Sequence, residues 1–321
     1  MNILIKRINI RHFNHFKFKK RYCTQKINIS GVYPPIITPF DENEEIAYNH
    51  LENNIEKWNK VPFRGLVIQG SNGEFASLSE DERVDVVKFV KRHISKDKLL
   101  IAGSGCEGTR TTVRMTERMA AVGADIAMVV TPCYYKGSMN EKALIKHYIT
   151  VADKSPIPII LYSVPPNTSL DLSANVIIKL SSHPNIIGLK DSGGDVSKLG
   201  YIVHKTKEHN FQVLAGSAGF FLPALTIGCV GGIFALANLL GEPLCNLHKL
   251  FLEGKLQEAQ CLQLRLISPN TYVTKKYGVA GLKAAMEWFG YYGGSTRLPI
   301  LPISKEEVEE ILKEFKENKL L

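Results

Sequence analysis

What the sequence lacks excludes several classes of protein. No apolar stretch among its 321 residues approaches the roughly 20 residues that a membrane-spanning helix needs. The six cysteines include no C-x-x-C pair, which excludes a zinc or disulfide framework and favours free thiols in a reducing compartment. No histidines show H-E-x-x-H spacing, so no metal site is expected. No G-x-G-x-x-G opens the first strand–helix unit, which disfavours a dinucleotide-binding fold.

Acidic residues are absent from the first thirty positions, and this absence explains most of the net charge of +9. Residues 1–30 carry eight lysines and arginines, whereas the rest of the chain is balanced, with 32 basic and 31 acidic residues. We therefore expect no nucleic-acid-binding face on the folded body. The basic segment resembles a mitochondrial transit peptide and predicts a mitochondrial matrix location, with a basic arm retained on the protein as the alternative.

From residue 31 onward, short apolar runs alternate with helical patterns, which is typical of repeated strand–helix units. The runs are apolar throughout rather than alternating, as expected for parallel strands that are buried on both faces. Eight such units over about 200 residues predict an α/β fold, a (β/α)8 TIM barrel, within residues 31–321. The predicted strands are Val32–Ile37, Gly65–Gln69, Leu99–Ala102, Ile126–Thr131, Ile157–Tyr162, Ile186–Lys190, Gln212–Ala215 and Gly232–Ala235.

Helix boundaries are marked most clearly by two capping boxes, Ser79 with Glu82 and Ser304 with Glu307. From about Gly241 to Leu321 the pattern predicts additional helices beyond the barrel. No second set of strands accompanies them, so we expect one barrel domain with a C-terminal helical extension. Further helices are predicted at Thr109–Val122, Asn140–Ala152 and Ser173–Ser181.

A lysine ends one of the predicted strands. Lys190 follows the run Asn185–Leu189 and precedes Asp191 and a Gly-Gly turn. A buried ammonium is unfavourable unless it is paired or has lost its proton. A lysine with a lowered pKa can form a Schiff base with a carbonyl substrate, whereas a structural lysine would be neutralised by Asp191. Taken alone, this segment favours a structural ion pair between Lys190 and Asp191. The remaining motifs of the chain favour a Schiff-base lysine instead.

Polar residues collect where the other predicted strands end. The site of a barrel of this kind lies at the carboxyl ends of its strands, so these residues are candidates for one rim. Two glycines that flank Ser71 and Asn72 suit a backbone-amide cradle for a carboxylate, and we expect Glu74 to hold that loop rather than to act in catalysis. The polar groups lie in Gly70–Glu74, Thr131–Tyr135, Tyr162–Pro165 and Gly216–Gly219.

Four segments together resemble the pyruvate-dependent class I aldolases, a family that includes dihydrodipicolinate synthase and N-acetylneuraminate lyase. The resemblance covers roughly residue 31 to the end, and the placement of Tyr162 and Lys190 one strand apart is specific to the family. The segments are Gly70–Glu74, Thr131–Tyr135, Tyr162–Pro165 and Gly188–Gly194.

The resemblance implies a mechanism without a metal or an organic cofactor. Lys190 would form a covalent imine with a small 2-oxo acid, and burial in the barrel mouth would lower its pKa so that a neutral amine is available. Tyr162 would shuttle protons through Ser71 and through Tyr134 of a neighbouring subunit. The family also implies a homotetramer built as a dimer of dimers.

The same resemblance implies where the substrate would be held. Ser71 and Asn72 would bind the pyruvyl carboxylate, and Ser192 and Gly216 are candidates for the distal carboxylate or hydroxyl. Asn167 is a further candidate. It stands where the synthases place an arginine that recognises a carboxylate of their second substrate, so its presence argues against lysine biosynthesis.

Some segments are more similar to one branch of the family, which cleaves 4-hydroxy-2-oxoglutarate to pyruvate and glyoxylate in hydroxyproline catabolism. These segments are Gly70–Phe75, Thr131–Tyr135, Gly188–Asp195 and Trp288–Gly294. The alternatives left open are another pyruvate-dependent lyase or synthase of the family, namely an N-acetylneuraminate lyase or a dihydrodipicolinate synthase, and a silent pyruvate-binding paralogue.

Overall fold

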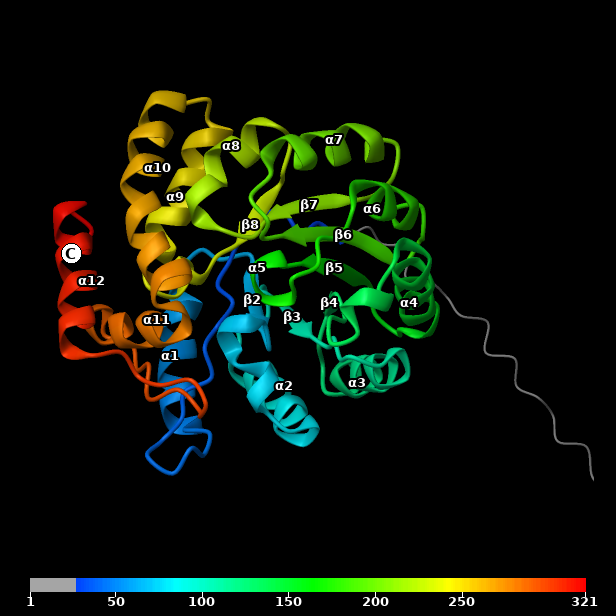
Figure 1. Ribbon diagram of the computed structural model, residues 1–321. Coiled ribbons are helices and arrows are strands. Elements are labelled where there is room, and N and C mark those ends of the chain that lie inside the picture. Colours follow the sequence, from blue (N-terminus) through cyan, green and yellow to red (C-terminus); the bar gives the residue numbers. More distant parts are fainter. Residues whose placement is uncertain (1–26) are drawn as a thin grey trace, which may run out of the picture.

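The structure is a computed structural model that describes residues 27–321. Eight parallel strands form the centre of the molecule, and helices surround them (Figure 1). The predicted α/β barrel is therefore confirmed, with all eight strands at the expected places. The strands are β1 Gly31–Tyr33, β2 Gly65–Ile68, β3 Leu99–Gly103, β4 Ile126–Val130, β5 Ile159–Ser163, β6 Ile186–Asp191, β7 Gln212–Ala215 and β8 Gly231–Ile233.

The barrel closes between its first two strands. The sheet runs in the order β1-β8-β7-β6-β5-β4-β3-β2, and backbone bonds then join β1 to β2. The Arg64 amide donates to Val32 O at 3.1 Å, and the Val67 amide donates to Pro34 O at 3.0 Å. Strand β1 is shorter than the predicted Val32–Ile37 because Pro34 and Pro35 have no N–H to donate to a ladder.

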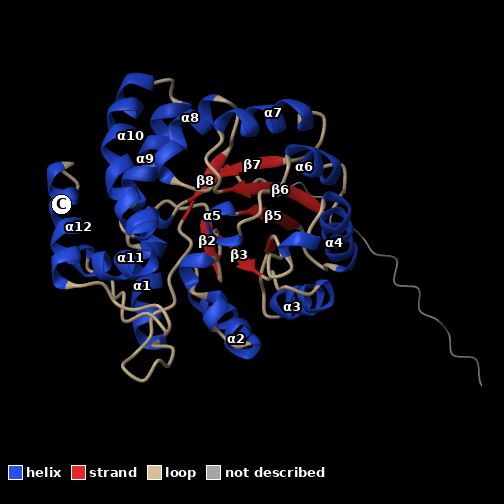
Figure 2. Ribbon diagram, in the orientation of Figure 1, coloured by secondary structure: helices blue, strands red, loops and turns tan. Residues whose placement is uncertain are grey.

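Helices form a ring around the barrel, and further helices follow it (Figure 2). Helix α9 follows β8 and contacts β1, so it completes the ring of helices around the barrel. The C-terminal extension was predicted to begin at about Gly241, where α9 starts. It instead consists of α10 to α12. No helix within residues 27–321 is both long and apolar enough to cross a bilayer. The helices are α1 Tyr48–Lys60, α2 Glu80–His93, α3 Thr109–Ala121, α4 Glu141–Lys154, α5 Pro165–Thr168, α6 Ala174–Leu180, α7 Val196–Thr206, α8 Phe221–Thr226, α9 Gly241–Leu252, α10 Leu256–Thr271, α11 Gly278–Met286 and α12 Lys305–Glu317.

Strands β1 to β7 each contribute to two apolar layers. In β2, Leu66 and Ile68 pack outward against the helices, whereas Val67 lies in the smaller inner core of the barrel. In β5, Ile160 and Tyr162 belong to the inner core. This alternation follows from the two-residue period of a strand, and it decides which side chains reach the barrel interior.

An irregularity in β6 changes that alternation. Ile159 of β5 pairs with Ile186, but the next residue, Ile160, pairs with Gly188, so β6 carries one extra residue. Ile186 and Leu189 consequently both belong to the outer layer although they are three residues apart. A one-residue bulge moves every following side chain to the opposite face. It therefore directs Lys190 into the barrel and Asp191 outward.

The leader predicted for residues 1–30 lies outside the described residues except for its last four. Of these four, Ile29 is fully buried in the inner core, and its amide donates to Gln212 Oε1 at 2.9 Å. Tyr33 Oη donates to Ile29 O at 3.0 Å. Residues 27–30 thus pack across the amino-terminal end of the barrel. The role of the segment before them as a transit peptide stays a prediction.

An arginine near the C-terminus ties the extension to the barrel. Arg297 donates two hydrogen bonds to the Glu82 carboxylate, at 3.1 and 2.6 Å, and one to Ser77 O at 3.0 Å. Glu82 also completes the predicted capping box with Ser79. The hydrogen bonds from Arg297 are the largest influence on Glu82 and lower the pKa of that carboxyl to about 2.

We expect the substitution Glu82→Gln to destabilise the protein at neutral pH but not at low pH. Glutamine still caps helix α2, so the variant isolates the ion pair. Because the folded pKa is depressed, the contribution is complete above the ordinary pKa of 4.5 and is lost as the pH falls toward 2. The pair is partly exposed, so the difference at pH 7 should be about 1 kcal/mol.

Urea unfolding between pH 7 and pH 3 checks this expectation. Asp85→Asn, on an exposed part of the same helix, should leave stability unchanged at each pH. A gap between Glu82→Gln and the parent that stays constant over this range would contradict the assignment.

Candidate functional site

A lysine and a tyrosine lie side by side at the carboxyl ends of two neighbouring strands. Tyr162 of β5 and Lys190 of β6 are paired in register, and both side chains face the barrel interior. Tyr162 is 3% exposed and Lys190 4% exposed. Lys190 Nζ lies 4.1 Å from the centroid of the Tyr162 ring, over its electron-rich face. The two predicted central residues are therefore in contact.

Asp191 does not neutralise Lys190. The Asp191 carboxylate binds Lys198 of α7 at 3.0 Å, and Lys198 also binds Asp171 at 2.6 Å. Burial alone would lower the pKa of Lys198, but the two carboxylates outweigh it and raise that pKa above its ordinary value. None of the ion pairs within residues 27–321 includes Lys190. The ion-pair interpretation of Lys190 is wrong because the bulge in β6 points Asp191 toward α7.

A serine hydroxyl contacts the tyrosine hydroxyl. Ser71 follows β2 in a short helical turn, Ser71–Gly73, and its Oγ lies 3.2 Å from Tyr162 Oη. Either oxygen can donate, so the pair can pass a proton in either direction. This contact agrees with the predicted relay between Ser71 and Tyr162.

These residues open onto one cavity of about 410 Å³. The predicted binding residues Asn72, Asn167, Ser192 and Gly216 line it together with Ser71, Tyr162 and Lys190. Gly216 is required by close packing, because a Cβ there would lie 2.2 Å from Ser192 Oγ and 2.6 Å from Asp191 O. All but one of the predicted site residues therefore lie around the same space.

Tyr134 is the exception. It is 77% exposed and packs edge to face with Tyr135, which is 70% exposed, at 5.0 Å between ring centroids. It does not line the cavity of its own chain. The loop is held by Glu107, whose Oε2 accepts hydrogen bonds from the amides of Cys133 at 2.9 Å and Tyr134 at 2.8 Å.

Part of the cavity wall comes from the C-terminal extension, which the sequence did not predict to contribute. After Pro269 the last turns of α10 widen into a π-helical turn, Tyr272–Lys276, and residues of this turn reach the cavity. A proline within a helical pattern is a signal for such a break, but it does not indicate a site. The additional wall residues are Thr274, Lys275, Gly278, Val279 and Ile300.

A buried ion pair holds this wall against the loop after β2. Glu74 and Lys283 of α11 are 2.6 Å apart, and their side chains are 0% and 1% exposed. Lys283 also donates to Ser295 O at 2.7 Å, and the Arg297 amide donates to Glu74 Oε2 at 3.1 Å. Burial lowers the pKa of Lys283, with Glu74 opposing that change. Glu74 therefore holds the loop, as expected, and lines no part of the Lys190 cavity.

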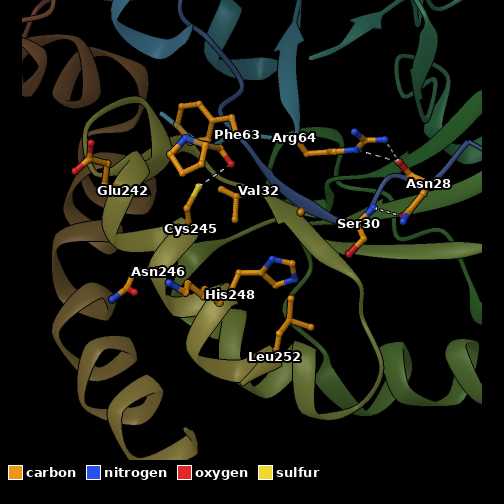
Figure 3. Close-up of a pocket in the computed structure, with 13 residues that line it drawn as sticks. Asn28, Ser30, Val32, Phe63, Arg64, Glu242, Cys245, Asn246, His248 and Leu252 are labelled. Atoms are coloured by element: carbon orange, nitrogen blue, oxygen red, sulfur yellow. Dashed lines mark hydrogen bonds between the residues drawn. The ribbon is translucent and has the colours of Figure 1, made fainter. Parts of the chain in front are cut away.

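A wider depression of about 920 Å³ lies at the opposite end of the barrel, around the start of β1 (Figure 3). Its Arg64 side chain donates to Asn28 O at 3.2 and 3.0 Å, and the Cys245 thiol donates to Pro62 O at 3.6 Å. Burial raises the pKa of Cys245 to about 12, so this thiol stays protonated and is a poor nucleophile. The depression therefore contains no activated thiol, whereas the predicted site residues line the smaller cavity that contains Lys190.

A closed parallel barrel with a buried lysine and a paired tyrosine at the carboxyl ends of its strands defines the class of (β/α)8 barrel enzymes. The chain belongs to the dihydrodipicolinate synthetase family, whose model matches residues 28–318. This finding confirms the family that the four motifs indicated, and it places the chain among lyases and synthases.

Individual relatives carry two different names. The chain is 34% identical over 276 residues to a 4-hydroxy-tetrahydrodipicolinate synthase of Methanothrix thermoacetophila, covering 86% of this chain and 92% of that protein. It is also 34% identical over 296 residues to a probable mitochondrial 4-hydroxy-2-oxoglutarate aldolase of Emericella nidulans, covering 90% and 95%. Among solved structures, the chloride-inhibited dihydrodipicolinate synthase of Acinetobacter baumannii complexed with pyruvate matches with a TM-score of 0.87 at 26% identity, covering 92% and 100%.

We expect Glu107→Ala to loosen the loop that carries Tyr134. Hydrogen bonds to a charged acceptor contribute about 1.5–3 kcal/mol each, so losing two should raise amide exchange at Cys133 and Tyr134 at least tenfold. Hydrogen exchange read by mass spectrometry on the peptide spanning residues 131–138 checks this. Glu117→Ala, an exposed position on α3, is the matched control. Unchanged exchange in Glu107→Ala would show that the loop is held by other contacts.

Proposed function

We propose that the protein is a class I aldolase that cleaves 4-hydroxy-2-oxoglutarate to pyruvate and glyoxylate. The observation that carries the proposal is the register pair Tyr162–Lys190, in which a buried amine without a carboxylate partner faces a cavity beside a phenol hydroxyl. The relative from Emericella nidulans, which bears this activity in its name, supports the choice of substrate.

The chemistry begins at Lys190. The lone pair of its Nζ attacks C2 of the substrate, and loss of water gives a protonated imine. Removal of the proton from the 4-hydroxyl then breaks the C3–C4 bond, and the bonding electrons move into the imine to form the enamine of pyruvate. Glyoxylate leaves as the aldehyde. Protonation at C3 and hydrolysis of the imine release pyruvate and restore the amine, so no metal or organic cofactor is required.

Proton transfer is assigned to Tyr162. A phenol with an ordinary pKa near 10 needs a relay to act as a base at neutral pH. Ser71, 3.2 Å from Tyr162 Oη, is the first member of that relay. We propose that Tyr134 of a neighbouring subunit is the second, which would account for its exposure on the isolated chain. This assignment makes the protein an obligate oligomer, and by resemblance a homotetramer.

The remaining cavity residues are assigned to substrate binding. Ser71 and Asn72 hold the carboxylate next to the imine carbon, because hydroxyl and amide donors at the end of β2 suit an anion. Ser192 and Gly216, with Asn167, face the distal part of the substrate. We further propose the mitochondrial matrix as the compartment, on the basic leader and on the mitochondrial relative.

The second candidate is a dihydrodipicolinate synthase. It is favoured by the name of the Methanothrix thermoacetophila relative and by the pyruvate complex of the Acinetobacter baumannii enzyme. Both reactions pass through the enamine of pyruvate on Lys190. The aldolase forms it by cleaving 4-hydroxy-2-oxoglutarate, whereas the synthase forms it from pyruvate and adds it to a second substrate, aspartate semialdehyde. Asn167, at the family's arginine position, lacks the charge that would bind the carboxylate of that second substrate, which favours the aldolase.

We expect pyruvate followed by borohydride to add a stable adduct to Lys190, because reduction traps the imine. Peptide mass spectrometry locates the adduct, and Lys190→Arg should form none. Turnover assays then separate the substrates: 4-hydroxy-2-oxoglutarate should be cleaved, whereas sialic acid and the pair of pyruvate with aspartate semialdehyde should not react.

Each result tests a different part of the proposal. An adduct on another lysine would refute the site. An adduct on Lys190 with turnover of aspartate semialdehyde would identify the synthase, and an adduct without turnover of any substrate would identify a silent paralogue.

We expect Tyr162→Phe to slow cleavage far more than imine formation. Loss of a general acid–base residue costs about 10²–10⁴-fold in rate, whereas the attack by Lys190 needs no proton from the 4-hydroxyl. Single-turnover cleavage and borohydride trapping measure the two steps separately. Tyr201→Phe, at an exposed position on α7 outside the cavity, is the control. Equal losses in both steps would remove Tyr162 from the shuttle role.

A further inference from the structure

The charged side chains that line the cavity are all basic. Among the described residues that line it, none is an aspartate or a glutamate, and the only two cationic side chains are Lys190 and Lys275. Under the proposed function the Lys190 amine becomes the imine nitrogen. Lys275 is then the one primary amine that remains in the wall to offset negative charge on a bound substrate.

Lys275 comes from the π-helical turn Tyr272–Lys276, which belongs to the C-terminal extension rather than to the barrel. A π-turn inserts an extra residue into a helix, and such turns are frequent at functional sites. Its neighbour Lys276 is occupied by an ion pair with Glu310. Lys275, in contrast, takes part in none of the ion pairs found within residues 27–321, and its side chain is solvent-exposed.

The backbone that carries Lys275 is fixed against the barrel. Thr274 Oγ1 donates to Asn270 O at 2.5 Å, and Asn270 Nδ2 donates to Ser217 Oγ at 3.0 Å in the loop after β7. Asn270 is 2% exposed, so this link is shielded from water. Lys275 thus combines a positioned main chain with a long side chain whose ammonium has no ion-pair partner among residues 27–321.

We propose that Lys275 binds the distal carboxylate of a 2-oxo dicarboxylic acid and so makes the cavity selective for dianionic substrates. This inference rests on the proposed function and deepens it, because it names the charge at the end of the substrate that the aldolase selects. A carboxylate–ammonium hydrogen bond is about twice as strong as a neutral one, so the amine favours a charged tail over an apolar tail of the same length.

The test compares two 2-oxo acids of equal chain length in borohydride trapping on Lys190. 2-Oxoglutarate carries a terminal carboxylate, and 2-oxopentanoate carries a methyl group there. The parent protein should be half-saturated by 2-oxoglutarate at a concentration about 10-fold lower than by 2-oxopentanoate. In Lys275→Met the two concentrations should become equal within about twofold, through weaker binding of 2-oxoglutarate alone, whereas Lys275→Arg should keep the preference.

Lys276→Met is the matched control, because it removes the adjacent charge, which is held by Glu310 outside the cavity. Its preference should equal that of the parent. In turnover of 4-hydroxy-2-oxoglutarate, Lys275→Met should raise KM and leave kcat within about threefold, because the distal carboxylate is bound equally in ground and transition states.

The outcomes separate the two proposals. No adduct on Lys190 with either acid would overturn the proposed function, and the inference with it. Adducts with no preference in the parent, or with a preference that survives in Lys275→Met, would overturn the role of Lys275 and leave the aldolase proposal standing.

Discussion

The site depends on one extra residue in a strand. Without the bulge opposite Ile159 and Ile160, the alternation that starts at Ile186 would turn Lys190 toward the helices and Asp191 into the barrel. The bulge exchanges the two. The carboxylate then binds Lys198 on α7, and the amine is left beside an aromatic ring with no carboxylate partner among residues 27–321. A register shift of one residue therefore decides whether the Asp191 carboxylate or the Lys190 amine points into the barrel.

The attachment of the C-terminal extension to the barrel encloses the Lys190 amine. The barrel supplies the floor of the cavity, but one side of the wall belongs to helices that follow the eighth strand. The Glu74–Lys283 pair joins the two parts where water is excluded, and Arg297 repeats the connection nearer the surface. Removing one partner of a buried pair leaves an uncompensated charge, so a fault here would reach both stability and the shape of the cavity.

The sequence predicted the barrel and most of the candidate site because both depend on local patterns. Eight apolar runs and their polar ends are visible in the residues themselves, and Tyr162, Ser71 and Lys190 do meet at one rim. What it could not predict depends on pairing between distant segments. The bulge exists only between β5 and β6, and the wall at Thr274–Val279 requires the fold of the extension.

The order in which the cavity parts occur along the chain affects its biosynthesis. A ribosome that has reached Ile233 has made every strand and the amine, yet the wall residue Ile300 follows Lys190 by 110 positions. Every strand of the barrel is therefore complete in the growing chain while part of the wall around Lys190 is still to be made. The cavity around Lys190 can thus reach its final shape only after the last third of the chain has been synthesised and has folded against the barrel.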